Sequence, residues 1–306
     1  VIESRGLGDV YKRQTYSCPR LRNWQMDKKM KYGVIGFPIE HSRSPEIHHS
    51  FANQFDLEIT FTKHLVRKHE CSSWVKDFFN NEGIGLSVTL PLKEEAFKLA
   101  DVISDRALQA GAANMLHLKE DKIFADCTDG VGLVNDLKVK EIELQAKNVL
   151  VIGAGGASRG IIPSILSENP QQLIVANRTA EKAYKLVAEI QSLSGFHMKS
   201  SILMPSSLTL DNIANTSFDL VINATSISTS PESKLEINSE IFKDAAVALD
   251  LYYSQKDTLF MKMAKDQSVP EVFDGWGMLV QQAAESFLQW TGLEPDTSEL
   301  IRSRGA

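Results

Sequence analysis

The sequence predicts an α/β protein with two domains, on three grounds. Its 306 residues can fill two compact cores, because a domain usually takes about 100–200 residues. Strand-like runs alternate with helix-like segments along most of the chain, which indicates mostly parallel sheets with helices on their faces. Hydrophobic residues make up 43% and charged residues 24%, a balance typical of folded rather than disordered proteins.

In the first half of the chain, short apolar or alternating runs predict strands, and the segments between them predict helices. The expected strands are Tyr32–Phe37, Ile59–Val66, Ile84–Leu90 and two within Ala112–Thr128 that turn at Glu120–Asp121; the expected helices follow Pro45, cover Cys71–Asn80 and begin near Asp129.

Between Lys138 and Asn148 the chain is charged and loses its apolar pattern, so we expect a hinge there. A second α/β unit follows. Its expected strands are Asn148–Ile152, Leu173–Ala176, Leu220–Ala224 and Val247–Leu251; its expected helices follow the first of these strands and cover Ala180–Ser192, and a further helix covers Leu279–Trp290.

Composition argues against several classes of protein. The net charge is −6 and the basic residues are scattered, which disfavours nucleic-acid binding. No apolar run approaches the ~20 residues that span a bilayer. The three cysteines lie far apart without a C-x-x-C, so we expect no disulfide framework, no structural zinc and a reducing, cytoplasmic location. They are Cys18, Cys71 and Cys127.

Two pairs of histidines, His48–His49 and His64/His69, lack a second set of ligands nearby. We therefore expect solvated surface side chains and no metal site. Residues 1–25 do not fit the fold pattern. A transit peptide is disfavoured by its acidic residues, and Gly6–Gln14 resembles translated cloning or adaptor sequence, so we expect a non-native or disordered tail with the true start at Met26 or Met30.

A glycine turn is the strongest local signal. The apolar strand before it runs directly into Gly153-Ala154-Gly155-Gly156-Ala157, and a helix follows, which is the context of a dinucleotide-binding fingerprint. Gly153 permits the tight turn, and Gly155 allows the backbone to approach a pyrophosphate at the helix N-terminus. Ser158 takes the place of the third small residue. The alternative is a plain strand–helix turn, but the context favours a Rossmann-like nucleotide domain.

The next strand indicates the cofactor. NAD-specific folds usually carry an acid about 20 residues after the turn, to hold the ribose 2′-hydroxyl. Here the strand ends in Asn177-Arg178-Thr179, and Lys182 follows. Arg can bind a phosphate with two parallel hydrogen bonds, so the pattern favours NADP. The alternative is that Arg178 is a solvated loop cation.

Two loops in the first half carry candidate chemical groups. Ser42 and Ser44 lie on a loop that ends at Pro45, although Ser44 could equally be a helix N-cap with Pro45 at the first helical position. Thr89 ends a strand, and Lys93 falls in the first turn of a helix, where the helix dipole disfavours its charged form and could prepare it for proton transfer. The alternative is an exposed Lys93 paired with Glu94 or Glu95. Asp129 could likewise be a helix cap.

Taken together, these motifs resemble the shikimate dehydrogenase family from about Lys31 to Gly292. The matching segments, in the family's order, are Gly36-x-Pro38, Ser42-Arg43-Ser44-Pro45, Thr89-x-Pro91-x-Lys93, Gly111-Ala112-Ala113-Asn114, Thr128-Asp129-Gly130, Gly153 to Ala157, Asn177-Arg178-Thr179, Asn223-Ala224-Thr225-Ser226 and Gly275-x-Gly277-Met278-Leu279. The positions that depart from the family pattern are Cys127 for Asn, Ser228 for Gly, Gln255 for Pro and Lys182 for Arg.

The resemblance implies an oxidoreductase that reversibly reduces 3-dehydroshikimate to shikimate with NADPH, on the route to chorismate and the aromatic amino acids. It implies a substrate-binding catalytic domain of residues 30–128 plus 276–306, an NADP-binding domain of residues 129–275, and a C-terminal helix that returns to the first domain. A homodimer is one option that the sequence leaves open.

The resemblance also implies roles for single residues. Lys93 would carry the proton, with Asp129 beside it, and the two serines would bind the substrate carboxylate. The substrate hydroxyls would be held by Thr89, Asn114, Asp129, Tyr253 and Gln282. The nicotinamide end of the cofactor would lie near Asn223–Ser226, including Thr225, and near Leu251, Gly275 and Met278.

Two alternatives remain. A quinate/shikimate dehydrogenase with NAD or relaxed cofactor use is disfavoured by Asn177-Arg178-Thr179 and the intact serines. A non-catalytic regulator on the same scaffold would be expected to lack Lys93 or Asp129, and both are present. A structural or protein-interaction module would leave the glycine turn unexplained.

Overall fold

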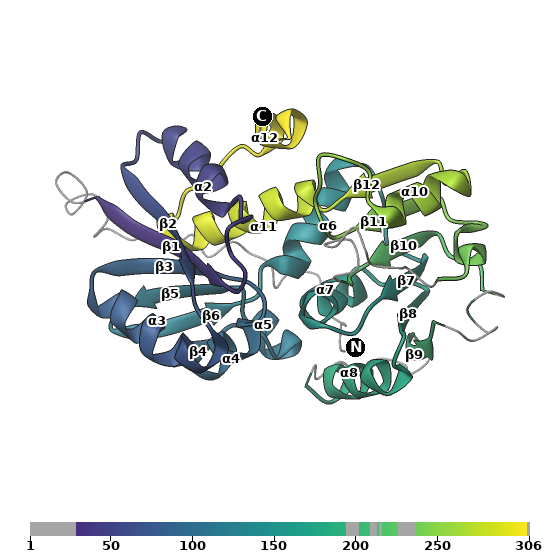
Figure 1. Cartoon of the computed structure of the whole chain (residues 1–306), viewed down its shortest axis with the longest axis horizontal. Helices are drawn as coiled ribbons and strands as arrows, with labels where there is room; N and C mark the ends of the chain where they lie inside the picture. Colours follow the sequence, from purple (N-terminus) through teal and green to yellow (C-terminus); the bar gives the residue numbers. More distant parts are fainter. Residues whose placement is uncertain (1–28, 194–201, 209–212, 214–215, 226–236, 305–306) are drawn as a thin grey trace, which may run out of the picture.

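The computed structural model describes residues 29–193, 202–208, 213, 216–225 and 237–304. The expected tail of residues 1–25, which includes Cys18, lies outside the described residues, as do Ser226 and Ser228. The described part forms two six-stranded sheets, each with helices on its faces, as Figure 1 shows. The predicted two-domain α/β architecture is confirmed.

The first sheet is mixed. Its strands are β1 (Met30–Gly36), β2 (Ile59–Leu65), β3 (Gly83–Val88), β4 (Val102–Ile103), β5 (Met115–Lys119) and β6 (Lys122–Asp126). They lie in the order β2-β1-β3-β5-β6-β4. β1 is parallel to β2 and β3, whereas β5 is antiparallel to β3 and β6. The expected turn at Glu120–Asp121 joins β5 to β6, and both of its residues have positive φ.

The second sheet is wholly parallel. Its strands are β7 (Asn148–Ile152), β8 (Gln172–Asn177), β9 (Leu203–Ser207), β10 (Leu220–Asn223), β11 (Val247–Asp250) and β12 (Glu271–Asp274). The order β12-β11-β10-β7-β8-β9 reverses direction between β7 and β10. Dinucleotides bind at this kind of switch point, outside the carboxyl ends of the strands.

The helices connect and cover the sheets. They are α2 (Ser44–Asn53), α3 (Cys71–Asn80), α4 (Lys93–Lys98), α5 (Asp105–Ala110), α6 (Asp129–Val139), α7 (Gly156–Ser167), α8 (Ala180–Leu193), α10 (Leu259–Asp266), α11 (Trp276–Thr291) and α12 (Ser298–Ser303), with short 3-10 turns η1 (Lys68–Glu70) and η3 (Ser239–Phe242). Within the described residues, none of these helices has both the length and the apolar character needed to cross a membrane.

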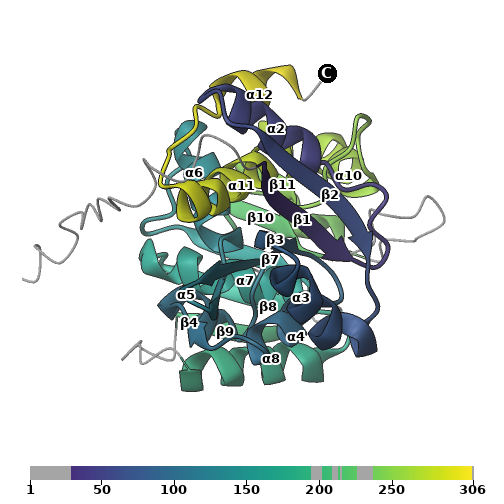
Figure 2. The same cartoon turned by 90° about the vertical axis from the view of Figure 1, so that its left-hand side faces the viewer.

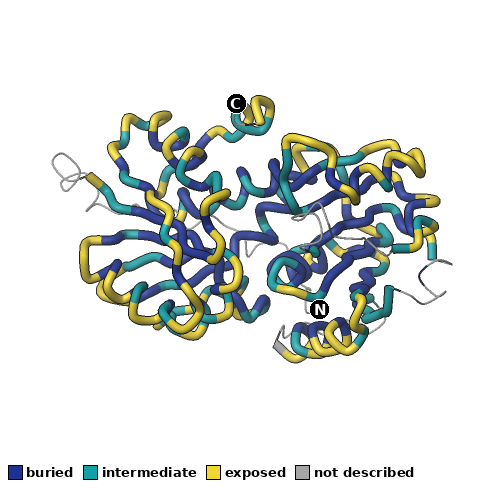
Figure 3. Tube along the Cα trace, in the orientation of Figure 1, coloured by how far each residue is buried: buried dark blue, intermediate teal, exposed yellow. Residues whose placement is uncertain are grey.

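Two helices tie the domains together. α6 follows the first sheet, but its Leu133 and Leu137 pack in the core of the second sheet. α11 follows the second sheet and returns, so that Phe287 and Trp290 pack with Tyr32 in the core of the first sheet. Figures 1 and 2 show α11 beside α6 and against the first sheet, and Figure 3 shows both helices largely buried. The expected return of the C-terminal helix is confirmed.

Three short strands, β4, β9 and β12, could not be recognised from the sequence. β4 has only two residues, and β9 contains Pro205, which normally weakens a strand assignment. β12 begins with the exposed Glu271 and carries no long apolar run. Each of these strands is defined by its parallel pairing with a neighbour, β6, β8 or β11, rather than by its own pattern.

His48 lies in an aromatic cluster between α2 and the first sheet. Its ring stacks on Phe61 with centroids 4.4 Å apart and planes 7° apart, and its centroid is 5.1 Å from that of Trp290. The side chain is only 1% exposed, so the expected surface position is wrong. The reason is that His48 shares the buried face of α2 with Ile47 and Phe51. Neither ring nitrogen has a hydrogen-bond partner among the described residues.

Replacing His48 with Phe should remove a pH-dependent part of the stability. Burial, and then the nearby His49, lower the pKa of His48 to about 3, whereas an unfolded His titrates near 6.5. A depressed pKa contributes stability above pH ~6.5 that is lost as the pH falls towards 3. As the pH is lowered below ~6.5, the free energy of unfolding of the wild-type protein should fall relative to that of His48→Phe by about 1.4 kcal/mol per pH unit.

Urea denaturation of both proteins at pH 7.5, 6.5 and 5.5 measures this difference. His117, whose pKa burial also lowers, to about 4, is present in both proteins and therefore cancels. If the difference in free energy of unfolding between the two proteins were the same at all three pH values, His48 would not be desolvated in the folded state.

Candidate active site

The neighbouring strands β1 and β3 bring two loops to one edge of the first sheet. Because the strands are parallel, their carboxyl ends lie together. The Thr89 N–H donates to the Ile35 carbonyl at 2.9 Å, and the Phe37 N–H donates to the Leu90 carbonyl at 2.9 Å. The loop after β1, which carries the two expected serines, is thereby joined to the loop that leads to Lys93.

Lys93 begins α4 and forms an ion pair with Asp129, the first residue of α6. The two side chains are 13% and 9% exposed. The second oxygen of this carboxylate, Oδ1, accepts a hydrogen bond from Asn114 Nδ2 at 3.0 Å, and the same amide group donates to Gln282 Oε1 at 3.0 Å. Four of the predicted site residues, from α4, α6, α11 and the loop before β5, therefore form a single polar cluster.

The pKa of Lys93 is raised above its usual value. Burial opposes the ammonium form, but the charge and the hydrogen bond of the Asp129 carboxylate outweigh burial. The expectation that the helix N-terminus disfavours the charged form is therefore wrong, because a carboxylate in direct contact acts more strongly than the first turn of a short helix. Lys93 pairs with Asp129 rather than with Glu94 or Glu95. It is an ammonium group that can donate to a developing negative oxygen.

A second layer of hydrogen bonds supports this cluster. The Thr128 N–H donates to Asn114 Oδ1 at 2.7 Å, and the Thr128 hydroxyl donates to the Gln282 carbonyl at 3.1 Å. The Thr128 hydroxyl also lies 3.2 Å from Ser286 Oγ. Thr128 is fully buried and fixes both the Asn114 amide and α11. Thr128 was not expected to have a role of its own, although it stands in the Thr-Asp-Gly motif beside Asp129.

Cys127 stands where the family resemblance leads us to expect Asn. Its side chain is buried, and Sγ lies 4.0 Å from Asp129 Oδ2. Burial, and then the charge of Asp129, raise the pKa of this thiol to about 12. Cys127 is therefore a neutral thiol near neutral pH and adds no charge to the Lys93–Asp129 pair.

The serine loop meets a side chain from the second domain. Ser42 Oγ donates to Ser44 Oγ at 3.2 Å. Arg43, not Ser44, is at the N-cap of α2, so the capping alternative for Ser44 does not hold. The N–H of Ser44, the first residue of the helix, donates to Ser42 Oγ at 3.3 Å. Tyr253, from the segment after β11, donates its hydroxyl to the His41 carbonyl at 2.9 Å. Tyr253 thus lies against the loop that carries both serines.

The glycine turn leaves room at the N-terminus of α7. Gly153 has φ +113°, a conformation that favours glycine, and a Cβ atom there would lie 3.1 Å from the Ala224 backbone at the end of β10. A Cβ atom on Gly155 would meet no described atom within 4 Å beyond its immediate neighbours. Ser158, the departure from the fingerprint, is buried and donates its hydroxyl to the Gly153 carbonyl at 2.7 Å. Serine therefore closes the turn instead of disturbing it.

The carboxyl end of β8 fits the phosphorylated ribose of NADP. Asn177 Nδ2 donates to the Thr179 carbonyl at 2.8 Å, which shapes the turn after the strand. Arg178 and Lys182 are both exposed beside it. Arg178 follows the strand end, where NAD-specific folds usually carry an acid, and its charge suits a 2′-phosphate rather than a 2′-hydroxyl. Glu181 is the one carboxylate between the two cations, in the first turn of α8.

The residues expected at the nicotinamide end follow strands β10, β11 and β12. Thr225 donates its hydroxyl to Asn223 Oδ1 at 2.7 Å, and Asn223 Nδ2 donates to Asp250 Oδ1 at 3.0 Å. A Cβ atom on Gly275 would overlap the backbone of Leu251, so these two segments are in close contact. Asp250 was not expected in the site; its only sequence signal is an acid at the end of an apolar strand.

The polar cluster around Lys93 and Asp129 lies against the helix that begins at the glycine turn. A Cβ atom on Gly156, the first residue of α7, would lie 3.6 Å from Leu90 Cδ2, next to Thr89. A Cβ atom on Gly160, one turn further along α7, would lie 2.9 Å from Asp129 Oδ2. Both contacts place the Lys93–Asp129 pair against the helix that begins at the turn.

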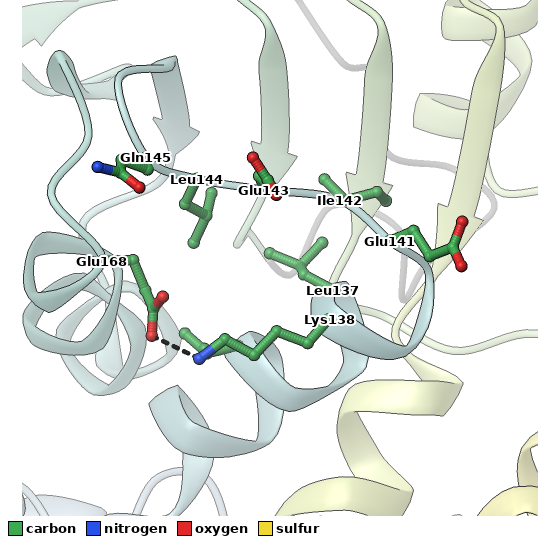
Figure 4. Close-up of a pocket in the computed structure, with 9 residues that line it drawn as sticks. Leu137, Lys138, Glu141, Ile142, Glu143, Leu144, Gln145 and Glu168 are labelled. Atoms are coloured by element: carbon green, nitrogen blue, oxygen red, sulfur yellow. Dashed lines mark hydrogen bonds and ion pairs between the residues drawn. The ribbon is translucent and has the colours of Figure 1, made fainter.

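A separate cavity of about 400 Å³ lies at the other end of α6 (Figure 4). It has an apolar floor and an acidic rim, and the Lys138 ammonium group crosses one side to Glu168 at 2.8 Å. None of the predicted site residues lines it. The lining residues are Val134, Leu137, Lys138, Glu141, Ile142, Glu143, Leu144, Gln145 and Glu168.

Three family models match the chain. The model described as "Shikimate dehydrogenase substrate binding domain" matches residues 34–116. "Shikimate / quinate 5-dehydrogenase" matches residues 136–246, and "Shikimate 5'-dehydrogenase C-terminal domain" matches residues 275–302. The three matches follow the order of the two sheets and the returning helix.

Curated relatives match over nearly their whole length. A shikimate dehydrogenase (NADP(+)) of Colwellia psychrerythraea is 41% identical over 271 residues, which cover 89% of this chain and 94% of the relative. Another, of Legionella pneumophila, is 42% identical over 272 residues, with 89% and 97% covered. The structure of shikimate 5-dehydrogenase from Thermus thermophilus in complex with NADP(H) and shikimate is similar with a TM-score of 0.79 at 29% identity, covering 90% of this chain and 100% of that one. The chain belongs to the shikimate dehydrogenase family.

Proposed function

We propose that the protein catalyses the reversible, NADP-dependent interconversion of 3-dehydroshikimate and shikimate. The observation that carries this proposal is the Lys93–Asp129 ion pair, which lies against the helix that begins at the glycine turn. The activity is that of its family, whose curated members are named NADP-dependent shikimate dehydrogenases. It serves the pathway to chorismate and the aromatic amino acids.

Lys93 and Asp129 are the proposed catalytic residues. When bound, NADPH supplies a hydride to the ring ketone of the substrate. The Lys93 ammonium group donates to the ketone oxygen, stabilises the negative charge that develops there and transfers a proton to it. Asp129 keeps Lys93 charged and fixes its position, and in the oxidising direction the pair receives the proton back.

The remaining polar groups are proposed to hold the substrate. The hydroxyls of Ser42 and Ser44 donate to its carboxylate, and the proximity of the two hydroxyls suits the two oxygens of that group. The substrate hydroxyls bind to a set of side chains that surrounds the ion pair and the serine loop. These are Thr89, Asn114, Asp129, Tyr253 and Gln282.

The proposed cofactor residues lie along the carboxyl edge of the second sheet. The open backbone of the glycine turn receives the pyrophosphate, and the cations after β8 receive the 2′-phosphate. The residues are Gly153, Ala154, Gly155, Gly156 and Ala157 at the turn, Asn177, Arg178, Thr179 and Lys182 after β8, and Thr225, Leu251, Gly275 and Met278 at the nicotinamide end.

We also propose the division into a catalytic domain of residues 30–128 plus 276–306 and an NADP domain of residues 129–275. Each sheet has its own hydrophobic cores on its two faces, which supports this division. A cytoplasmic location and a homodimer stay predictions, to be tested by cell fractionation and by light scattering of the purified protein.

The proposed function is tested with purified protein, shikimate and each oxidised cofactor. Absorbance of the reduced nicotinamide should rise with shikimate and NADP+, and more slowly with NAD+ or with quinate. Quinate belongs in the test because one matching family model covers both substrates. Turnover of quinate with NAD+ above that of shikimate with NADP+ would overturn the assignment.

Replacing Lys93 with Ala should lower kcat by a factor of about 10²–10⁴, the usual contribution of acid–base catalysis. The KM of shikimate should change little, because the proposed substrate contacts come mainly from other side chains. Steady-state kinetics measure both values. Lys98→Ala, at the exposed end of the same helix, is the matched control and should keep wild-type kinetics. A large rise in KM with intact kcat would contradict the catalytic role of Lys93.

Replacing Arg178 with Asp should raise the KM of NADP+ by about tenfold or more, since charge-assisted contacts to phosphate are among the stronger hydrogen bonds. The KM of NAD+ should stay the same or fall, because NAD+ lacks the 2′-phosphate. Lys185→Asp, an exposed charge reversal on α8, is the control. An equal rise in the KM of NADP+ and of NAD+ would mean that Arg178 does not bind the 2′-phosphate.

A further inference from the structure

Asp136 is a carboxylate fully buried where α6 crosses α11. It is 0% exposed and pairs with Lys140, the C-cap residue of α6, whose side chain is 17% exposed. Its Oδ2 atom is buried and has no hydrogen-bond partner among the described residues. Removing a carboxylate from water is costly unless its neighbours compensate for the lost hydration. The proposed mechanism gives this residue no task.

The first turn of α11 lies directly against this carboxylate. A Cβ atom on Gly277 would overlap it, so only glycine allows the two helices to approach so closely. Gly277 immediately precedes Met278, which belongs to the proposed nicotinamide end. A carboxylate at a helix N-terminus is stabilised by the helix dipole. Asp136 therefore holds the start of α11 by charge as well as by contact.

The surroundings of Asp136 connect it to β12. Lys140 Nζ lies 5.2 Å from the centroid of the Phe273 ring, so the cation is shared between the carboxylate and the strand that leads into α11. Asp274 follows Phe273. Unlike Asp136, it has a hydrogen bond to each carboxylate oxygen: it accepts from the Trp276 N–H at 3.2 Å and from the Ser254 N–H at 3.2 Å. Burial, with Asp274 nearby, raises the pKa of Asp136, although Lys140 opposes this.

The same helix carries Asp129 at its first residue. Asp136 follows seven positions later, two turns of a rigid helix and roughly 10 Å along its axis. Between them Gly132 contacts Gln282 on α11, since a Cβ atom there would lie 2.6 Å from Gln282 Cβ. α6 thus spans the distance between the proton-transferring pair and the turn proposed for the nicotinamide.

We propose that Asp136 is a positioning residue for hydride transfer: its carboxylate fixes the Gly275–Met278 turn relative to the Lys93–Asp129 pair. The proposal rests on the proposed function, because it assigns the nicotinamide to that turn. It predicts that loss of the charge affects the nicotinamide half of the cofactor and spares the adenosine half, which binds at the distant Arg178.

The test uses Asp136→Asn, which keeps the shape of the side chain and removes its charge. The Kd of NADP+ and of adenosine 2′,5′-bisphosphate, which lacks the nicotinamide, is measured by calorimetry well below the Tm of the variant. The Kd of NADP+ should rise several-fold and kcat should fall about tenfold, since small misplacement of reacting groups is costly. The Kd of the bisphosphate and the KM of shikimate should stay within about twofold. Asp266→Asn, exposed on α10, is the control.

Two further variants distinguish the effect of the Asp136 charge from the effect of the volume that its side chain occupies. Gly277→Ala should reproduce the selective loss of NADP+ affinity, because its methyl group displaces the carboxylate. The double variant Asp136→Ala/Gly277→Ala relieves the overlap but restores no charge, so it should remain impaired. Full recovery in the double variant would show that Asp136 only fills space and would overturn the proposal.

Two other results would also overturn it. One is an Asp136→Asn protein with a lower Tm but unchanged kcat and NADP+ affinity, which is the signature of a purely structural residue. The other is an equal loss of affinity for NADP+ and for the bisphosphate. Wild-type turnover is measured first: if shikimate and NADP+ give none, the proposed function fails, whereas the two binding constants still decide the role of Asp136.

Discussion

The ion pair between Lys93 and Asp129 is the interaction on which the site depends. Both charges are largely removed from water, which costs free energy unless the remaining hydrogen-bonding capacity is used. Asn114 meets this need by donating to the second oxygen of the carboxylate, and Thr128 in turn holds the Asn114 side chain. The pair therefore stays charged, and the ammonium group keeps a fixed position against α7, the helix that begins at the glycine turn.

α6 connects this ion pair to both sheets. Its first residue, Asp129, belongs to the polar cluster, its Leu133 and Leu137 belong to the core of the second sheet, and its Asp136 lies against the start of α11. α11 then returns to the first sheet and supplies Gln282 to the cluster. One pair of crossing helices thus fixes both the side chains proposed to bind the substrate and the turn proposed for the nicotinamide, which limits how far the domains can shift independently.

Most of the fold could be predicted because each long element carries its own pattern. The apolar strand before the glycine turn and the helix after it are local features that the sequence shows directly. Elements such as β4 and β9 could not be predicted, because their strand conformation depends on pairing with β6 and β8. β5 and β6, in contrast, were expected, because the turn at Glu120–Asp121 lies between them and makes them antiparallel.

The sequence by itself determined the kind of chemistry: a glycine turn with Arg178 just after the next strand, and Lys93 and Asp129 in the motif order of one family. Only the tertiary structure decided the electrostatics. His48 looks like a surface residue but is buried on a helix face, and Lys93 was expected to lose its proton readily but gains affinity for it. The physical reason is the same in both cases: a pKa depends on burial and on partners distant in sequence, which no local pattern contains.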